Sequence, residues 1–173
     1  ELFHPHLRGG KPGDKHVNKV AKGLPGYPDD PKPVAESKGD CLPPIQYGYR
    51  SFDRQWIVPD SRVINQPNPE LWRSHGEYQV YLTAPSDRSP TAGPALSFTT
   101  YIPDLHHYNG RGGRVFPLWR DAAATTPNLP PRFLEFLSKT YKTAVTAEDF
   151  IAYLAGVAAN PAYTARFQSD LSQ

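Results

Sequence analysis

The sequence is poor in sulfur and in long apolar runs. Its 173 residues include one cysteine, Cys41, and no methionine. A single cysteine excludes an internal disulfide and a zinc site built from cysteines, which suits a reducing cytoplasm. No run is apolar and long enough to span a membrane, and the first residues lack a signal-peptide core. We therefore expect a cytoplasmic protein with no membrane partner. Because the chain starts at Glu1 without methionine, we also expect an excised fragment.

The excess of one sign of charge over the other is small as well. The chain has 19 lysine and arginine residues against 17 aspartate and glutamate residues, a net charge of +2. That balance is too small to indicate nucleic-acid binding, so such a function must depend on where the charges cluster. In contrast, 20 prolines and 13 glycines predict an extended or turning path with few long helices. A hydrophobic content of 38% still favours a globular fold.

Catalytic motifs are missing too. An adenine methyltransferase needs an Asn-Pro-Pro-aromatic motif for the flipped base, but Pro43-Pro44 and Pro130-Pro131 lack the polar first residue and Asn160-Pro161 lacks the second proline. The glycines of 110–113 precede no strand-to-helix transition, so they form neither a methyl-donor loop nor a phosphate loop. No nucleophile elbow of a Ser-His-Asp hydrolase occurs. We predict no catalytic residue, and a free-standing enzyme is our least favoured hypothesis.

Two patterns could suggest a metal site. Pro28-Asp29 followed by Glu-Ser-Lys at 36–38 has the loose spelling of a metal-dependent nuclease. Prolines within that run remove the amide donors that the required strands need, so we interpret the match as coincidence. His106 and His107 could ligate a metal, but adjacent side chains diverge on a strand and no third ligand has suitable spacing. We predict no metal and no cofactor in this chain.

Composition and periodicity divide the sequence into three parts. Residues 1–45 have no sustained period and form a basic segment rich in proline and glycine. Residues 46–121 contain short aromatic runs typical of strands. These runs are 47–50, 55–58, 78–82 and 95–99. The alternation of Tyr78, Val80 and Leu82 with Gln79, Tyr81 and Thr83 predicts a strand with one face buried.

Residues 122–173 change to a helical pattern. We predict a helix after Pro130-Pro131, a second after a capping box at 146–149, and a third, short one after Asn160-Pro161. Asn68-Pro69 predicts an earlier helical turn. The apolar side chains expected to face the core are Phe133, Leu134, Phe136, Leu137, Tyr141, Phe150, Ile151, Leu154 and Val157.

The predicted fold class is α+β. We expect a small, twisted, mostly antiparallel sheet with Pro- and Gly-rich loops, followed by a C-terminal packet of about three short helices. The β-rich recognition part is predicted at 46–121 and the helical part at 122–173. Together, 46–173 should form one compact domain.

Residues 98–120 stand out as a predicted hairpin. Strand-forming residues lie on both sides of a glycine-rich turn. No carboxylate occurs from Leu105 to Arg120, so the tip has an uncompensated positive potential, which indicates an anionic partner. An ordinary solvated hairpin with a polar loop is the alternative. The polar and basic residues of the tip are His106, His107, Tyr108, Asn109, Arg111 and Arg114.

Three segments together resemble a known family. They are residues 47–72, 93–131 and 147–171. They include an aromatic opening, Tyr-Arg-Ser-Phe-Asp at 49–53, a Val-Phe-Pro-Leu strand at 115–118, and a closing helix. In this order they are similar to the C-terminal specificity region of Type ISP-like restriction-modification enzymes. Nearly the whole chain from Tyr47 onward is covered.

The chain departs from that family at a few positions. Ser51 stands where relatives often have proline, and Val58-Pro59 where aromatics are frequent. Gln66 stands where an arginine is common. The last difference could remove a phosphate contact or change a base preference.

The resemblance implies a target-recognition domain of a bacterial restriction-modification enzyme of the adenine-N6 methyltransferase type, which acts in phage defence. Such a parent has a methyltransferase domain upstream, often with an ATP-driven motor and a nuclease. S-adenosylmethionine, with ATP and magnesium where those domains occur, would act in the parent. The expected partners are double-stranded DNA and the upstream methyltransferase domain.

In such a domain, basic side chains contact phosphates and polar side chains at loop tips read base edges in the major groove. Arg50 and Asp53 have two open interpretations, an ion pair that fixes the turn and a contact with DNA. The predicted DNA-binding residues are Arg111, Arg114, Asn109, His106 and His107 first, then Arg54, Arg62, Gln66 and Arg73.

An alternative function belongs to a different class. The domain could be an interaction module that docks the methyltransferase to motor or nuclease domains through Trp56, Trp72, Trp119 and the aromatic strands. A continuous basic face would favour DNA, and an exposed aromatic patch would favour docking.

Overall fold

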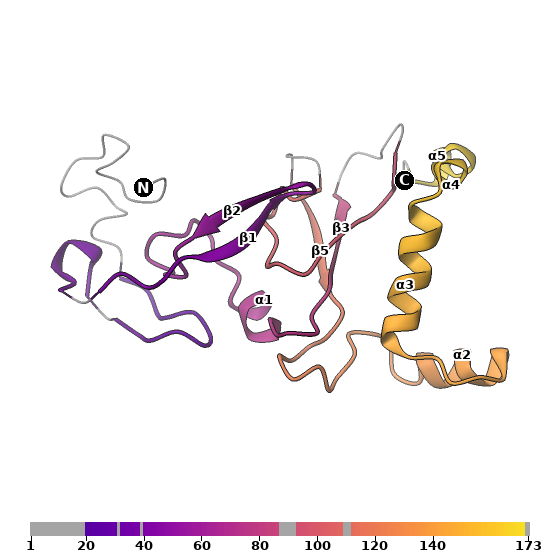
Figure 1. Cartoon of the computed structure of the whole chain (residues 1–173), viewed down its shortest axis with the longest axis horizontal. Coiled ribbons are helices and arrows are strands. Elements are labelled where there is room, and N and C mark those ends of the chain that lie inside the picture. Colours follow the sequence, from indigo (N-terminus) through magenta and orange to yellow (C-terminus); the bar gives the residue numbers. More distant parts are fainter. Residues whose placement is uncertain (1–19, 31, 39, 87–92, 109–111, 172–173) are drawn as a thin grey trace. The chain divides into compact units, whose positions relative to one another are not determined.

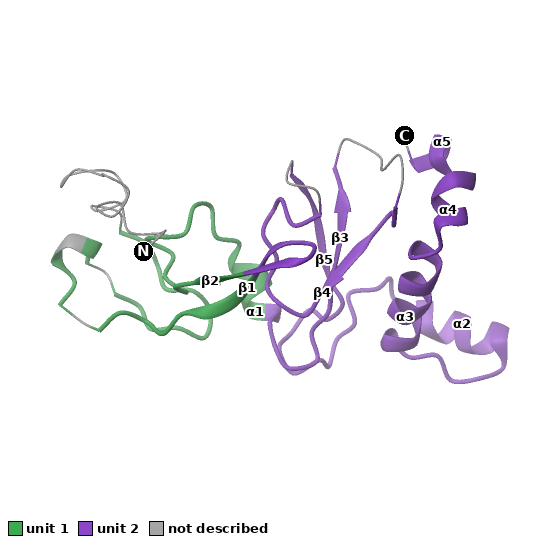
Figure 2. Cartoon of the chain, turned by 45° about the horizontal axis from the view of Figure 1, so that its top comes forward, with its two compact units in different colours: residues 1–47, 55–73 green, residues 48–54, 74–173 purple. Residues whose placement is uncertain are grey.

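The chain divides into two compact units, which are shown in Figure 2. Unit 1 consists of residues 1–47 and 55–73, and unit 2 of residues 48–54 and 74–173. The domain boundaries predicted from composition and periodicity stay predictions. No helix among the described residues is long and apolar enough to cross a membrane. The structure is a computed structural model that describes residues 20–30, 32–38, 40–86, 93–108 and 112–171.

Unit 1 is mostly irregular chain around a few buried side chains. Its helical elements are the 3-10 helix η2 (Val34–Glu36) and α1 (Pro69–Ser74), whose last residue belongs to unit 2. As predicted, Asn68 caps α1, because its Oδ1 accepts a hydrogen bond from the amide of Glu70 at 3.2 Å. The buried apolar side chains include Leu24, Ile57 and Trp72.

Strands β1 (Ile45–Arg50) and β2 (Asp53–Ile57) form a two-stranded sheet (Figure 1). The strands predicted at 47–50 and 55–58 are thus confirmed, with slightly different ends. Only Ser51 and Phe52 join β1 to β2. The turn end of this hairpin, residues 48–54, belongs to unit 2.

A three-stranded antiparallel sheet forms the centre of unit 2, in the order β4-β3-β5. On the middle strand, Leu82 is paired with Phe98 on one side and with Phe116 on the other. The predicted hairpin of 98–120 is therefore wrong, because its two strands flank a third strand instead of pairing with each other. The strands are β3 (Tyr81–Pro85), β4 (Ser97–Thr99) and β5 (Gly113–Pro117).

The physical reason lies in the segment that follows β4. The amide of Gly48 in β1 donates to the carbonyl of Ile102 at 3.0 Å, and the amide of Asp104 donates to the carbonyl of Gly48 at 2.9 Å. Between them, Pro103 bridges to Gly48 in parallel and has no amide of its own to donate to another strand. The segment therefore pairs with β1 and does not turn back on itself.

The residues that lead into β3 are buried in a pattern that the sequence did not predict. Tyr78 is 66% exposed, whereas Gln79 is 1% exposed and Leu82 is buried. The Gln79 side chain donates to the carbonyls of Ser74 and Trp119 at 2.6 and 2.8 Å, and accepts from the Trp119 amide at 3.0 Å. Because its hydrogen bonds are satisfied, this polar side chain can be buried.

The C-terminal part of unit 2 is helical, as predicted. Thr146 Oγ1 accepts from the amide of Asp149 at 3.1 Å and Asp149 Oδ2 accepts from the amide of Thr146 at 2.9 Å, which forms the expected capping box. Asn160 caps the third helix by accepting from the amide of Ala162 at 3.0 Å. The α+β fold class is confirmed. The helices are α2 (Phe133–Tyr141), α3 (Ala147–Ala158), α4 (Pro161–Arg166) and α5 (Gln168–Leu171).

A small apolar cluster joins the sheet end of unit 2 to its helices. Leu134 of α2 and Ile151 of α3 pack against this cluster. Phe136 and Tyr141 were also expected to face the core, but they are 64% and 70% exposed. The cluster therefore covers only part of the apolar stripe of α2. The cluster consists of Leu118, Trp119 and Ala147.

Candidate nucleic-acid interface

The turn between β1 and β2 is held in place by the two residues before Phe52. The hydroxyl of Ser51 donates to the carbonyls of His107 and Tyr108 at 3.0 and 2.9 Å. Arg50 donates from Nη1 to Asp104 Oδ1 at 3.1 Å and forms an ion pair with it. The turn is therefore fixed to residues about 55 positions later in the chain. A proline at position 51 could not make either hydroxyl bond.

His107 connects this region to the central sheet. It is 2% exposed, and its Nδ1 lies 3.0 Å from Thr83 Oγ1 in β3. Burial lowers the pKa of His107, and the charge of Arg50 lowers it further against the opposing effect of Asp104. Gly48 lies close by, since a Cβ there would meet the imidazole Cδ2 at 3.2 Å. His107 therefore acts as a neutral packing residue.

A pocket of about 400 Å³ lies beside the turn, entirely within unit 2. The Arg54 guanidinium lies 4.8 Å from the centre of the Tyr101 ring, and its Nη1 donates to the Tyr101 hydroxyl at 3.3 Å. Phe52, on the turn itself, is 99% exposed. The pocket is lined by Gly48, Arg50, Ser51, Phe52, Asp53, Arg54, Val80, Phe98, Thr99, Thr100, Tyr101 and His107.

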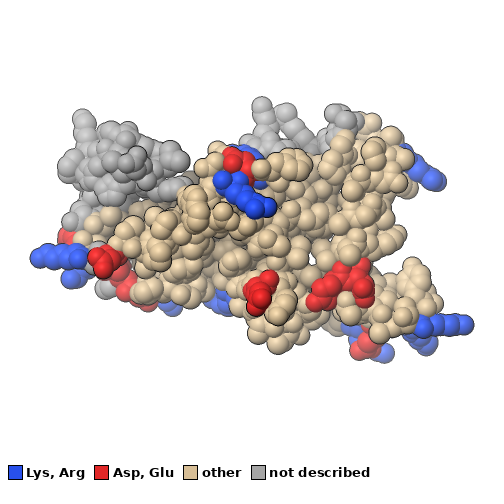
Figure 3. Space-filling view, in the orientation of Figure 1, with Lys and Arg blue, Asp and Glu red and all other residues tan. Residues whose placement is uncertain are grey.

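The surface around the turn combines exposed aromatic side chains with both signs of charge. Basic side chains gather near the turn of the β1–β2 hairpin, beside acidic ones (Figure 3). Within the pocket, Asp53 accompanies Arg50 and Arg54, and Asp104 offsets the charge of Arg50. Two guanidinium groups lie over aromatic rings here. Besides Arg54 over Tyr101, Arg50 lies 3.8 Å from the centre of the Tyr49 ring. In such a pair, the aromatic ring can stack on a base and the guanidinium group can bind phosphate.

Comparison with known proteins identifies the family. The sequence matches the family model described as the Type ISP C-terminal specificity domain over residues 12–173. The chain belongs to this family. The resemblance drawn from its three motifs is thereby confirmed, and the family has a target-recognition role in restriction-modification. No curated protein and no solved structure gives a significant match.

The predicted hairpin residues of this specificity domain fall into different environments. Asn109 and Arg111 lie outside the described residues. Arg114 is exposed on β5, and His106 is partly buried, with its Nδ1 accepting from the amide of Gly112. His107 is buried as described above. The predicted role of these residues in DNA binding stays a prediction.

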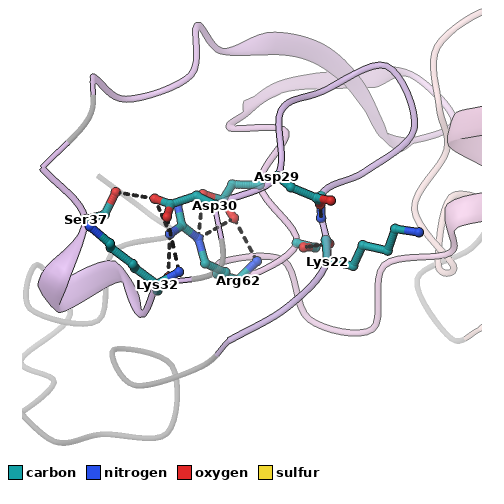
Figure 4. Close-up of polar contacts among 9 residues, drawn as sticks. Lys22, Asp29, Asp30, Lys32, Ser37 and Arg62 are labelled. Atoms are coloured by element: carbon teal, nitrogen blue, oxygen red, sulfur yellow. Dashed lines mark hydrogen bonds and ion pairs between the residues drawn. The ribbon is translucent and has the colours of Figure 1, made fainter.

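The predicted DNA-binding residues of unit 1 also differ from one another in burial and pairing. The Arg62 side chain is 10% exposed and forms ion pairs with Asp60 at 2.5 Å and Asp30 at 2.8 Å (Figure 4). Its Nη1 also donates to the carbonyl of Lys32 at 2.7 Å. Gln66 is exposed with φ of 51°, and Arg73 is exposed and paired with Glu70 of α1.

The Arg62 cluster changes the titration of its carboxylates. The pKa of Asp30 is lowered to about 2 by hydrogen bonds from the Ser37 hydroxyl, the Lys32 amide and Arg62. Burial alone would raise the pKa of Asp60, but its hydrogen bonds with Arg62 and the charge of that residue lower it. Asp30, Asp60 and Arg62 therefore stay charged at neutral pH and tie residues 30–37 to 60–62.

Two further expectations can be compared with the described residues. Trp72 and Trp119, named for docking, are 7% and 8% exposed and belong to the core, whereas Trp56 is 60% exposed. No group of three or more potential metal ligands occurs in the described part of the chain. Phe52 and Tyr101 were not predicted as site residues. A bulky aromatic in a turn of two residues, where glycine or asparagine is usual, is the signal that could have identified Phe52.

Proposed function

We propose that this specificity domain binds duplex DNA through the surface around the β1–β2 turn of unit 2. The observation that carries the proposal is the placement of Arg54 on the ring of Tyr101 at an open pocket, next to the exposed Phe52. A stacked guanidinium keeps its N–H groups at its edge, where they can donate to phosphate or to a guanine. The fixed turn presents these groups without prior rearrangement.

The set of DNA contacts follows from exposure. Arg54 and Arg114 are exposed on unit 2 and are proposed to bind DNA, together with Asn109 and Arg111 as expected from the sequence. Because His107 is buried, its side chain cannot reach DNA, so we assign it to packing. The donors of Arg62 are occupied by two carboxylates and a carbonyl, so we assign Arg62 to stability. His106, Gln66 and Arg73 are retained as weaker candidates.

The chemistry of the reaction is placed elsewhere in the parent enzyme. We infer a parent of the adenine-N6 methyltransferase type that acts in the cytoplasm in phage defence. S-adenosylmethionine, ATP and magnesium would bind to its other domains. The residues of this chain do not fit a cofactor loop, because Gly112-Gly113 leads into β5 and not into a helix. The methyltransferase domain and double-stranded DNA are the proposed partners.

Selection from random duplexes tests the proposal in the intact enzyme. We expect one enriched sequence, bound with an affinity that falls steeply as salt rises, because the contacts with phosphate release counterions. Arg54→Ala should weaken binding to that sequence while the fold stays intact. Enrichment of no sequence, or an affinity independent of salt, would contradict DNA recognition by this domain.

Docking to another domain of the parent is the second candidate. It is favoured by Phe136 and Tyr141 of α2 and Tyr153 of α3, which are 64–70% exposed. Large exposed aromatics of this kind are enriched where proteins associate. These residues lie on the helical part of unit 2, away in sequence from the β1–β2 turn, so both functions can be tested separately.

A further inference from the structure

Phe52 is the most exposed large apolar side chain among the described residues, at 99%. An aromatic ring of this size normally loses much of its contact with water on folding, because burial of its surface is favourable. Here the ring stands at the end of a turn of two residues, where a small or polar residue would serve equally well for the turn. The position therefore indicates a partner for the ring.

We propose that Phe52 is a stacking wedge that inserts into the target duplex and packs against a base at an opened step. This inference rests on the proposed function and assigns a mechanism to it. Apolar side chains in other DNA-binding proteins unstack base steps in this way, at a cost of about a few kcal/mol per step. Stacking of the exposed base on the ring offsets that cost.

A wedge must be rigid, and the structure shows how Phe52 is supported. The preceding Ser51 is tied by its hydroxyl to the carbonyls of His107 and Tyr108, and Arg50 is tied to Asp104. The backbone of Gly48 pairs with residues 102–104. Because the residues that precede Phe52 hold the turn, insertion of the ring would not require the loss of backbone freedom that weakens binding by a loose loop.

The groups around the ring favour a nucleobase as its partner. Arg54 stacked on Tyr101 offers a second flat surface with a positive charge at its edge, at the pocket that Phe52 also lines. Asp53 lies in the same lining, and a carboxylate repels phosphate but accepts a hydrogen bond from the amino group of cytosine. The pocket has the volume of a small-ligand site, about 300 Å³ or more.

Fluorescence of 2-aminopurine tests this proposal in the intact enzyme. The selected duplex would carry the analogue at one position at a time through and beside the target sequence. Wild-type enzyme should raise the fluorescence at one step, where the base is unstacked. Phe52→Ala should abolish that rise and weaken specific binding about 5- to 150-fold, the equivalent of about 1–3 kcal/mol for one stacked base. Phe52→Trp should keep both signals.

Tyr78→Ala is the matched control, because Tyr78 is an exposed aromatic residue of the same unit that does not line the pocket. It should change neither the fluorescence nor the affinity. Since Phe52 contributes almost nothing to the core, thermal unfolding of Phe52→Ala should match that of the wild type.

The outcomes separate this inference from the proposed function. If the wild type selects a sequence but Phe52→Ala keeps its affinity and the fluorescence rise, the wedge is wrong and DNA recognition stands. A loss of affinity in Phe52→Ala without any unstacked position in the wild-type complex also overturns the wedge. If the wild type selects no sequence at all, both proposals fail.

Discussion

The two units use arginine in opposite ways. In unit 1, Arg62 is nearly buried and donates to Asp30 and Asp60. In unit 2, Arg54 is exposed and lies over the ring of Tyr101. The first guanidinium has its donors occupied by carboxylates and a carbonyl, whereas the second lies over an aromatic ring and donates from Nη1 to the hydroxyl of that ring. One arrangement stabilises a chain with little secondary structure, and the other offers donors to a ligand.

The partner of the guanidinium distinguishes a structural arginine from one that is proposed to bind a ligand. A carboxylate neutralises the guanidinium and competes with phosphate for its N–H groups. An aromatic ring lowers the freedom of the side chain but leaves its hydrogen-bonding edge available. Arg50 shows both features, because it lies over Tyr49 and also pairs with Asp104. We therefore expect Arg54 to contribute more to DNA binding than Arg50.

The largest effect is expected from Arg62→Met. Removal of the guanidinium leaves the largely buried carboxylate of Asp60 without its cation, so the free energy of unfolding should fall by about 3 kcal/mol. Urea unfolding measures this change. Arg54→Ala, the matched control in unit 2, should change stability by about 0.5 kcal/mol or less, because exposed arginines contribute little. Equal losses in both variants would contradict the contrast between the units.

The next largest effect is expected on DNA binding. Arg54→Ala should weaken binding about tenfold, the size of one lost charged hydrogen bond of about 1.5 kcal/mol. If Arg54 holds a phosphate, all sequences should be affected alike and the salt slope should become shallower by about one. If it reads guanine, the preference at one base pair should relax instead. Binding titrations over a range of salt distinguish the two, and unchanged binding would remove Arg54 from the interface.

A smaller effect should separate the units by pH. Burial lowers the pKa of both His75 and His107, which lie in unit 2. Their neutral forms favour the folded state, so unit 2 should lose stability as the pH falls below the unfolded histidine pKa of about 6.5. In unit 1, the lowered pKa values of Asp30 and Asp60 preserve stability until the pH falls below about 4.

Hydrogen exchange between pH 7 and 4.5 measures that difference. Amides of unit 2 should lose protection first, and a variant with His107→Gln should show a weaker dependence on pH. Earlier loss of protection in the Arg62 region than around β3 would be inconsistent with these pKa shifts.

The smallest effect is expected from Arg132→Ala and Lys142→Ala at the two ends of α2. Arg132 pairs only with the exposed Glu135 among the described residues, and such pairs contribute less than about 1 kcal/mol. Neither substitution should change DNA affinity or the salt slope by a measurable amount. If either one weakened binding as much as Arg54→Ala, the interface would have to include the helices.

Local features of the fold could be predicted from the sequence because their causes are local. The cap of Asn68, the capping box of Thr146 and Asp149, and the start of α4 after Asn160 each depend on residues within a few positions. The pairing of β3 with both β4 and β5 could not be predicted in this way. It depends on Gly48 binding residues 102–104, more than fifty positions away.

For the candidate site, the sequence predicted the family and only some of the residues. Motif order indicated the specificity domain, and Arg54 was among the predicted contacts. The sequence ranked Arg62 with Arg54, because nothing nearby reveals that Asp30 will pair with Arg62 from 32 positions away. Phe52 was noticed as part of a motif, but its exposure follows from the tertiary structure around the turn.

Photocrosslinking at position 52 tests most directly whether the turn of unit 2 meets DNA. The intact enzyme would carry the photoreactive p-benzoylphenylalanine in place of Phe52, or in place of Phe136 as the matched position, and would be irradiated with its selected duplex. We expect a covalent adduct with DNA from position 52 and none from position 136. An adduct from position 52 with another domain of the enzyme, and none with DNA, would show that the turn is a docking surface.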